Sequence, residues 1–295
     1  MRLFLACLLC VQAFATRAQT CAIAESAAKA LERGDGGEAE HILAPFENAA
    51  PPCNQVLLNL ARLRAAQKQP QAAESYFARY LAAEPADEKG YLFFARFLFS
   101  MSDFPRADAM SAKAVSLDPV DADALILQGR LLIMKGEPAN GQVLLEKALQ
   151  IVPANAEAHF QLGALMDRSK RYAEAIRQFQ KVIALEPGNP QAYDYLALDL
   201  EPLGEIEKAE QAYQKALQVN QGPQFDSFLD YNYGRFLMKR NRLAESKKHL
   251  DRAVEMTPNV RAVRYERNTL NFRPENYQDA CDDADVNSAC RIQAM

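Results

Sequence analysis

Apolar and small residues recur in steps of three and four along most of the chain, which is the spacing of one face of an α-helix. The apolar stretches are short and are separated by turns that contain Gly or Pro, such as Gly34 to Gly37 and Gly136 to Pro138. No stretch alternates apolar and polar residues in the way that indicates a β-strand. The pattern therefore predicts an all-α chain of short amphipathic helices.

Prolines recur along the chain with a fixed period. Pro51, Pro85, Pro119, Pro153 and Pro187 are spaced by 34 residues each time, and Pro258 continues the series after an interruption. A period of this size is typical of a solenoid, in which each repeat stacks on the next. Because proline cannot continue a helix, each repeat is expected to be a pair of helices closed by a proline.

Two columns of residues come into register when the repeats are aligned. A small residue occupies the middle of each first helix: Ala27, Ala61, Ala95, Gly129, Gly163, Ala197 and Gly234. The second helices carry a mostly large column: Leu43, Phe77, Ser111, Leu145, Phe179, Tyr213 and Leu250. Small side chains let neighbouring helices approach closely, so we expect tightly packed helix pairs.

These columns and the closing proline resemble the tetratricopeptide repeat, a helix pair of 34 residues. Residues 156–189 match that pattern best, through Leu162, Gly163, Tyr172, Ala175, Phe179 and Pro187. The usual early Trp is absent, and Gln221 stands where the sixth repeat would have its proline. The resemblance implies an all-α, right-handed superhelical solenoid of antiparallel helix pairs.

The repeats divide the chain into three parts. Residues 1–18 are expected to be a signal peptide, residues 20–260 to be repeats, and residues 261–295 to be a C-terminal capping helix and a tail rich in Cys and Asp. Seven repeats are expected, at 20–53, 54–87, 88–121, 122–155, 156–189, 190–223 and 227–260. The extra three residues fall near Gln224 to Asp226, and Pro45 interrupts the second helix of the first repeat.

The N-terminus has the pattern of an export signal. Arg2 precedes an apolar run from Leu3 to Ala15 that is too short to span a bilayer. Cleavage after Ala15 or after Ala18 fits the preference for small residues, and we favour Ala18. A buried helix is the alternative interpretation of this run. We expect an exported protein, periplasmic or secreted, whose mature chain does not insert into a membrane.

The mature chain is moderately acidic. The full sequence has 34 Lys and Arg against 38 Asp and Glu, and loss of Arg2 and Arg17 brings the net charge to −6. An acidic chain without runs of basic residues is a poor binder of nucleic acid. We therefore expect no nucleic-acid partner.

Four cysteines remain after cleavage: Cys21, Cys53, Cys281 and Cys290. An even number in an exported chain favours disulfides over metal or redox chemistry. Three connectivities are possible, and proximity in the sequence favours Cys21 with Cys53 and Cys281 with Cys290. These disulfides would stabilise the two ends of the solenoid. Free thiols are the alternative interpretation.

No catalytic or metal-binding motif accompanies the repeats. The histidines are isolated from one another, and His159 is interpreted as an interior or groove histidine with a hydrogen-bond partner. Acids near the C-terminus lack the Gly and Glu of a calcium loop: Asp279, Asp282, Asp283 and Asp285. We expect no enzymatic activity, no cofactor and no metal site.

Arginines recur at one position of the first helices, which line the concave face in proteins that this chain resembles. These are Arg62, Arg96 and Arg130, with Arg235 after breaks at Ala164 and Leu198. Their apolar companions lie four residues earlier or three later: Leu58, Leu92, Ile126 and Phe160, with Phe99 and Ile133. Guanidinium groups beside apolar side chains suit an extended peptide with acidic or carbonyl groups. These residues are the predicted peptide-binding groove.

Two other interpretations of the groove stay open. In one, the arginines pair with acids of neighbouring helices, such as Asp87, Asp121 and Asp123, and only hold the repeats together. In the other, the chain is an envelope assembly factor, resembling repeat-built pilotins and outer-membrane assembly subunits, whose convex side also makes contacts. The function that the sequence favours is a non-catalytic scaffold or adaptor that binds a protein or peptide segment of unknown identity.

Overall fold

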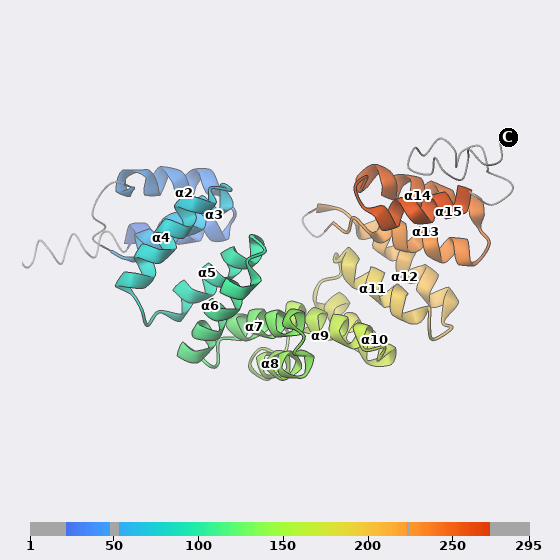
Figure 1. Ribbon diagram of the computed structural model, residues 1–295, viewed down its shortest axis with the longest axis horizontal. Helices are drawn as coiled ribbons and strands as arrows, with labels where there is room; N and C mark the ends of the chain where they lie inside the picture. Colours follow the sequence, from blue (N-terminus) through green and yellow to red (C-terminus); the bar gives the residue numbers. More distant parts are fainter. Residues whose placement is uncertain (1–21, 48–52, 223–224, 272–295) are drawn as a thin grey trace, which may run out of the picture. The chain divides into compact units, whose positions relative to one another are not determined.

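The computed structural model describes residues 22–47, 53–222 and 225–271, which form helices joined by short turns (Figure 1). No β-strand occurs within these ranges. The chain divides into two compact units, Met1–Pro153 (unit 1) and Ala154–Met295 (unit 2). In each unit, successive helices pack against each other in pairs. The predicted fold class, an all-α solenoid of antiparallel helix pairs, is confirmed.

Unit 1 contains helix pairs throughout its described residues. A helix over residues 22–32 precedes the labelled helices. These are α2 (Gly36–Leu43), η1 (Ala44–Phe46), α3 (Gln55–Ala66), α4 (Pro70–Ala83), α5 (Glu88–Ser100), α6 (Phe104–Leu117), α7 (Ala122–Lys135) and α8 (Pro138–Ile151). Helix α2 ends at Leu43 and a 3-10 turn that contains Pro45 follows, because proline disrupts the interior of a helix.

Unit 2 continues the pairs and ends, in its described part, with one further helix. Its helices are α9 (Ala156–Arg168), α10 (Tyr172–Leu185), α11 (Pro190–Leu200), α12 (Ile206–Val219), α13 (Leu229–Lys239), α14 (Leu243–Met256) and α15 (Arg261–Asn271). Helix α15 packs on α13 and α14, where the sequence places a capping helix. The expected signal peptide, Cys21, Cys281, Cys290 and the Asp-rich tail lie outside the described residues.

The small and large columns meet inside each helix pair. A Cβ atom added to Gly163 would lie 2.8 Å from the ring of Phe179, and one added to Gly234 would lie 2.8 Å from Leu250. The first helix therefore needs a small residue where the second helix inserts its large one. This close contact explains both columns, because interiors of proteins have no spare room for an extra methyl group.

Each turn inside a helix pair contains one residue in the left-handed backbone conformation. These residues are Gly34, Lys68, Ser102, Gly136, Lys170, Gly204 and Asn241. Glycine adopts this conformation without steric cost, which explains why the turn position holds glycine in several repeats. Turns between pairs end instead in helix caps, two residues after the closing proline: Asp87, Asp121, Asn155 and Asn189.

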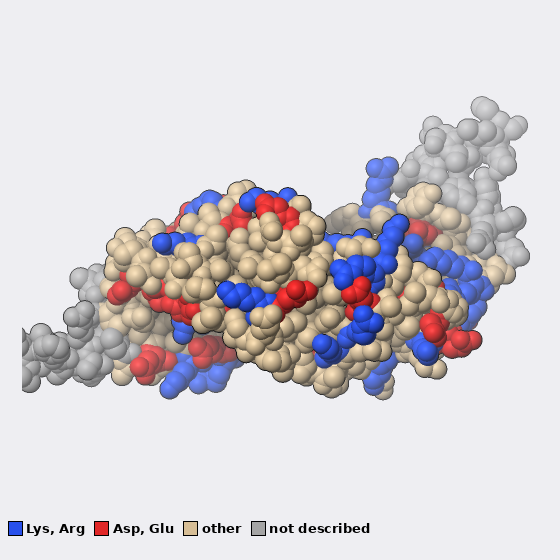
Figure 2. Space-filling model, turned by 90° about the horizontal axis from the view of Figure 1, so that it is seen from below, with Lys and Arg blue, Asp and Glu red and all other residues tan. Residues whose placement is uncertain are grey.

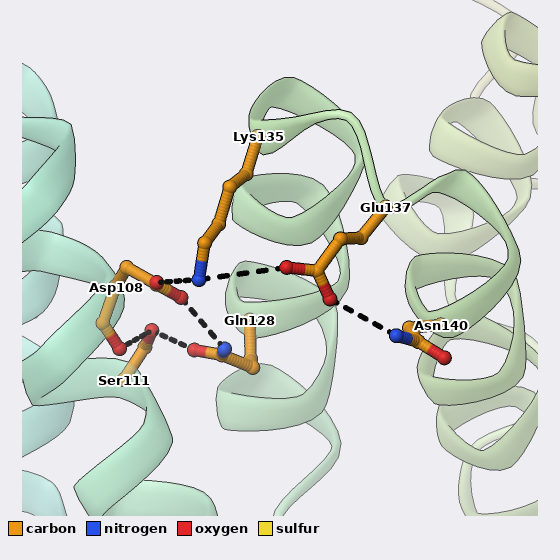
Figure 3. Close-up of polar contacts among 6 residues, drawn as sticks. All are labelled: Asp108, Ser111, Gln128, Lys135, Glu137 and Asn140. Atoms are coloured by element: carbon orange, nitrogen blue, oxygen red, sulfur yellow. Dashed lines mark hydrogen bonds and ion pairs between the residues drawn. The ribbon is translucent and has the colours of Figure 1, made fainter.

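One junction between repeats in unit 1 is polar where the preceding junction is apolar. Phe77 of α4 stacks on Phe94 of α5 with 5.0 Å between ring centroids. One repeat later, the equivalent residues are Ser111 of α6 and Gln128 of α7, both buried. Ser111 Oγ donates a hydrogen bond to Gln128 Oε1, and Gln128 Nε2 donates to Asp108 Oδ1 at 2.8 Å (Figure 3). The polar residue in the large column is therefore satisfied by a polar partner.

The polar junction continues to the surface through charged side chains. Lys135 Nζ lies 3.0 Å from Asp108 Oδ2 and 3.6 Å from Glu137 Oε1. Asn140 Nδ2 of α8 donates to Glu137 Oε2 at 3.0 Å (Figure 3). Side chains of α6, α7 and α8 are thus joined in one network, with its neutral part buried and its charged part towards solvent.

Two carboxyl groups are buried together where the repeat period is interrupted. Asp194 of α11 and Asp226 are 2% and 6% exposed. Asn232 Nδ2 of α13 donates to Asp194 Oδ2 at 2.6 Å, and Asn220 exchanges hydrogen bonds with the backbone of Asp226. Burial, with the neighbouring Asp226 charge, raises the pKa of Asp194 well above its usual value. Asp194 therefore keeps its proton above the pH at which an exposed aspartate loses it.

We expect Ser111→Ala to destabilise the chain more than Ser111→Ala combined with Gln128→Leu. The single change leaves the buried Gln128 Oε1 without its donor, which costs about 1–3 kcal/mol. The double change removes both polar groups and restores an apolar junction. Urea unfolding followed by circular dichroism measures both variants. Equal losses in the two variants would show that the buried hydrogen bond does not contribute.

We expect the free energy of unfolding to decline less steeply with rising pH in Asp194→Asn than in the wild type. The unfolded chain releases this proton at about pH 3.9, the value for a free aspartate, whereas the folded chain keeps it up to the raised pKa. Stability is therefore lost as the pH rises through that window. Urea unfolding from about pH 5 to about pH 8 gives the slope. Glu207→Gln, which changes an exposed acid of α12, is the control, and an unchanged slope in Asp194→Asn would refute the raised pKa.

Candidate functional site

Arginines and phenylalanines of three first helices form one surface in unit 1. On α5, Phe93, Arg96 and Phe99 are spaced by three residues and lie on one side of the helix. The guanidinium carbon of Arg62, on α3, lies 4.3 Å from the centre of the Phe93 ring. That of Arg130, on α7, lies 4.4 Å from the centre of the Phe99 ring. These five residues are called the arginine–aromatic surface below.

Two of these arginines show how the surface is held and charged. Arg96 is 45% exposed, and its Nη2 lies 2.8 Å from Asp123 Oδ2. Arg62 is half-buried, and its Nη1 donates to Asn59 Oδ1 at 3.4 Å. Burial lowers the pKa of Arg62, Glu32 opposes this change, and the Arg96 charge adds to it. Because arginine stays charged in proteins, Arg62 is a partly dehydrated cation that a nearby anion would stabilise.

Three of the predicted apolar contacts are wrong. Leu58, Leu92 and Ile126 are 7%, 4% and 5% exposed. Leu58 and Leu92 belong to one hydrophobic cluster that joins the repeats of unit 1. The position four residues before each arginine therefore faces neighbouring helices of the stack. These side chains stabilise unit 1 and are not accessible to a bound peptide.

The other predicted apolar residues are divided between surface and packing. Phe99 belongs to the arginine–aromatic surface. Ile133 is half-buried on α7, and a Cβ atom added to Gly141 would lie 2.6 Å from it. Phe160 is in unit 2, where its ring packs edge-on against Phe179 with 5.6 Å between centroids. Ile133 and Phe160 therefore contribute to the packing of their own helix pairs.

The acids proposed as arginine partners have different roles in the structure. Asp123 pairs with Arg96, as that interpretation expects. Asp87 and Asp121 instead accept hydrogen bonds from backbone N–H groups in the first turns of α5 and α7. They are helix caps, because the first N–H groups of a helix have no partner within it.

Sequence reasoning missed Phe93, which completes the surface. Its position in successive repeats holds Asn59, Phe93, Leu127 and Gln161, so no periodic signal marks it. Its distance of three residues from Arg96 on one helix is the signal that could have indicated it.

Residues with metal-ligating chemistry occur in both units. His159 is buried in unit 2, and its Nδ1 lies 2.7 Å from Gln178 Oε1, as an interior histidine with a partner. In unit 1, carboxylate oxygens of Glu88, Asp118 and Asp121 lie within 4.8 Å of one another, which the sequence did not predict. Asp118 and Asp121 already accept hydrogen bonds from backbone N–H groups. These bonds account for their positions at helix ends, and we assign no metal to them.

Charged side chains of both signs are interspersed on the face drawn in Figure 2, with wide uncharged areas between them. A partner on this face would therefore meet local charged groups rather than one broad field. Within the described ranges, each helix is too short or too polar to cross a bilayer.

Comparisons with known proteins agree with this architecture. A family model described as a tetratricopeptide repeat matches residues 132–198, and a second with the same description matches residues 192–223 and 231–260. No curated protein matches the sequence.

Several solved structures share the fold. The APC/C hetero-tetramer Cut9-Hcn1 superposes with a TM-score of 0.73 and 15% identity over 83% of this chain and 48% of that one. A tetratricopeptide repeat protein from Parabacteroides merdae ATCC 43184 superposes with a TM-score of 0.65 and 17% identity, over 85% of this chain and 98% of that one. PilW, described as a widely conserved type IV pilus biogenesis factor, superposes with a TM-score of 0.64 and 16% identity, over 72% of this chain and 97% of that one.

At these identities the structural likeness shows the fold alone. The family models locate the repeats themselves in the sequence, and the helix pairs of the described residues agree with them. Residues 132–223 and 231–260 of this chain are therefore tetratricopeptide repeats.

Proposed function

We propose that the chain is a non-catalytic scaffold that binds an extended, acidic segment of another protein on the arginine–aromatic surface of unit 1. One observation carries the proposal. Arg62 is a partly buried cation with no carboxylate at ion-pair distance among the described residues, and it lies beside the exposed Arg96. Glu32 acts on Arg62 only from beyond ion-pair distance, and a partner's carboxylate would supply a direct counter-charge.

The side chains of the surface suit such a segment chemically. A guanidinium presents its N–H donors in a planar fork that matches a carboxylate, so Arg62 and Arg96 can each hold an acidic side chain. The rings of Phe93 and Phe99 restrict the arginines above them and offer apolar contact to the rest of the segment. The fold supports this role, because stacked helix pairs present side chains of successive repeats in a regular row.

Selection from a displayed peptide library on the full mature chain tests this function. We expect the selected peptides to be enriched in Asp and Glu. Replacing Arg62, Arg96 and Arg130 by Gln should weaken the best peptide by about tenfold or more, since each exposed ion pair contributes up to about 1 kcal/mol. Fluorescence anisotropy with the labelled peptide gives both dissociation constants.

A second triple variant is the matched control. Arg33, Arg79 and Arg106 lie elsewhere in unit 1, are exposed, and remove the same charge when replaced by Gln. The control variant should bind like the wild type. A library selection without acidic enrichment, or equal weakening in both triple variants, would refute the proposed surface.

We further propose that the chain is exported, cleaved after Ala18 and oxidised to the disulfides Cys21–Cys53 and Cys281–Cys290. Of these residues Cys53 is described, and it is buried in the cluster that joins the first repeats. Intact mass and non-reducing peptide mapping of the protein from its source test this. We expect a chain that begins at Gln19 with both cross-links, and a chain that begins at Met1 would contradict export.

The envelope assembly role is the second candidate, and the shared fold with PilW is the observation that favours it. Such a role would use contacts on the convex side as well. A partner protein that the Arg62, Arg96 and Arg130 triple variant still retains in a pull-down would favour this candidate over the first.

A further inference from the structure

Unit 2 contains a pocket beside the C-terminal ends of α9, α11 and α13. Its volume is about 760 Å³, within the range of small-ligand sites. Charged residues on its wall are Asp167 of α9, Glu201 after α11, Lys239 of α13 and Arg240. Leu198, Pro202 and Ile206 give it an apolar side, and Tyr172 of α10 completes the lining.

Most of the charged groups on the wall already have partners within unit 2. Lys239 Nζ lies 2.9 Å from Glu201 Oε2, and Glu201 Oε1 accepts from the hydroxyl of Tyr213 at 2.8 Å. The guanidinium of Arg240 lies 3.6 Å from the centre of the Phe236 ring and donates to the Phe236 carbonyl. These contacts hold the two cations against unit 2.

The carboxyl groups on the α9 side, Asp199 and Asp167, lie against each other and have no cation as a partner within the described ranges. Asp199 of α11 is fully buried, and neither of its oxygens accepts a hydrogen bond from the described residues. Asp199 contacts Asp167, whose carboxylate forms no ion pair in the described part of the chain. A buried acceptor without a donor is costly. Arg240 Nε on the pocket wall is also buried without a hydrogen-bond partner in the described structure, but the Arg240 guanidinium keeps its contacts with Phe236, whereas Asp199 has no donor for either oxygen.

We propose that the pocket binds a cationic side chain, Lys or Arg, of a partner protein, with Asp167 as the direct counter-charge and Asp199 buried beside it. An ammonium or guanidinium group supplies the N–H donors that the carboxyl pair lacks. Leu198 and Ile206 would cover the methylene stem, as apolar surface does for Lys and Arg elsewhere. The inference rests on the proposed function, because a partner supplies the cation, but it uses another unit and the opposite charge.

Binding at this pocket should be coupled to loss of a proton. Burial, followed by the Asp167 charge, raises the pKa of Asp199 to about 8. A bound cation favours the ionised form of Asp199 and so displaces its proton. Affinity should therefore rise by about tenfold between about pH 7 and about pH 9, where lysine stays protonated. Glu201, Lys239, Arg240 and Tyr172 are the other titratable groups that face the pocket.

The test uses the full mature chain and the peptide acetyl-Ala-Lys-Ala-amide, followed by ¹H–¹⁵N NMR at several pH values. We expect shifts of backbone signals near the pocket and the rise in affinity with pH. The peptide acetyl-Ala-Gln-Ala-amide should not bind. Asp167→Asn should weaken binding by about tenfold, as loss of a close counter-charge does, whereas Asp167→Glu should keep it.

Two further variants separate binding from a purely structural role. Asp199→Asn should still bind the lysine peptide but lose the pH dependence, and Glu207→Gln should match the wild type in both respects. Equal binding of both peptides, a pH profile that survives Asp199→Asn, or no binding of the lysine peptide would each overturn the site. Failure of the lysine peptide to bind would not affect the proposed function, because the selection of acidic peptides by unit 1 tests that function separately.

Discussion

The close approach of the two helices within each repeat is the constraint on which the rest of the structure depends. A small residue in the first helix receives a large residue of the second, as Gly163 receives Phe179 and Gly234 receives Leu250. Side-chain packing at this distance leaves no room for a methyl group, so it fixes which faces of the helices meet. The outward sides of the first helices are left free to vary, and the arginine–aromatic surface occupies one of them.

The contacts between repeats allow more variation than those within a repeat. Phe77 and Phe94 make an apolar junction, whereas Ser111 and Gln128 at the equivalent positions make a polar one that is equally buried. In unit 2, α11 carries two buried acids, Asp194 near Asp226 and Asp199 near Asp167 of α9. Local polar chemistry can thus be placed between repeats without disturbing the helix pair itself.

The helix pairs were predictable from the sequence because their signals are local and repeated. The closing prolines and the small and large columns recur from repeat to repeat, so most repeats carry their own signal. The burial of Leu58, Leu92 and Ile126 was not predictable in this way. A first helix packs against its own partner and against neighbouring repeats, so most of its sides are buried. Helix α3 shows this, because every residue from Val56 to Ala61 is buried. Apolar periodicity then fails to separate core from surface.

The central claim is that Arg62, Arg96 and Arg130 hold an acidic segment, and arginine side-chain NMR tests it most directly. The Nε–Hε signals of these residues would be followed while a selected acidic peptide is added to the wild-type chain. The account predicts that these signals shift with the peptide's binding curve, while those of Arg33, Arg79 and Arg106 do not. The account would be contradicted if only Arg33, Arg79 and Arg106 shifted, or if no arginine signal of unit 1 shifted.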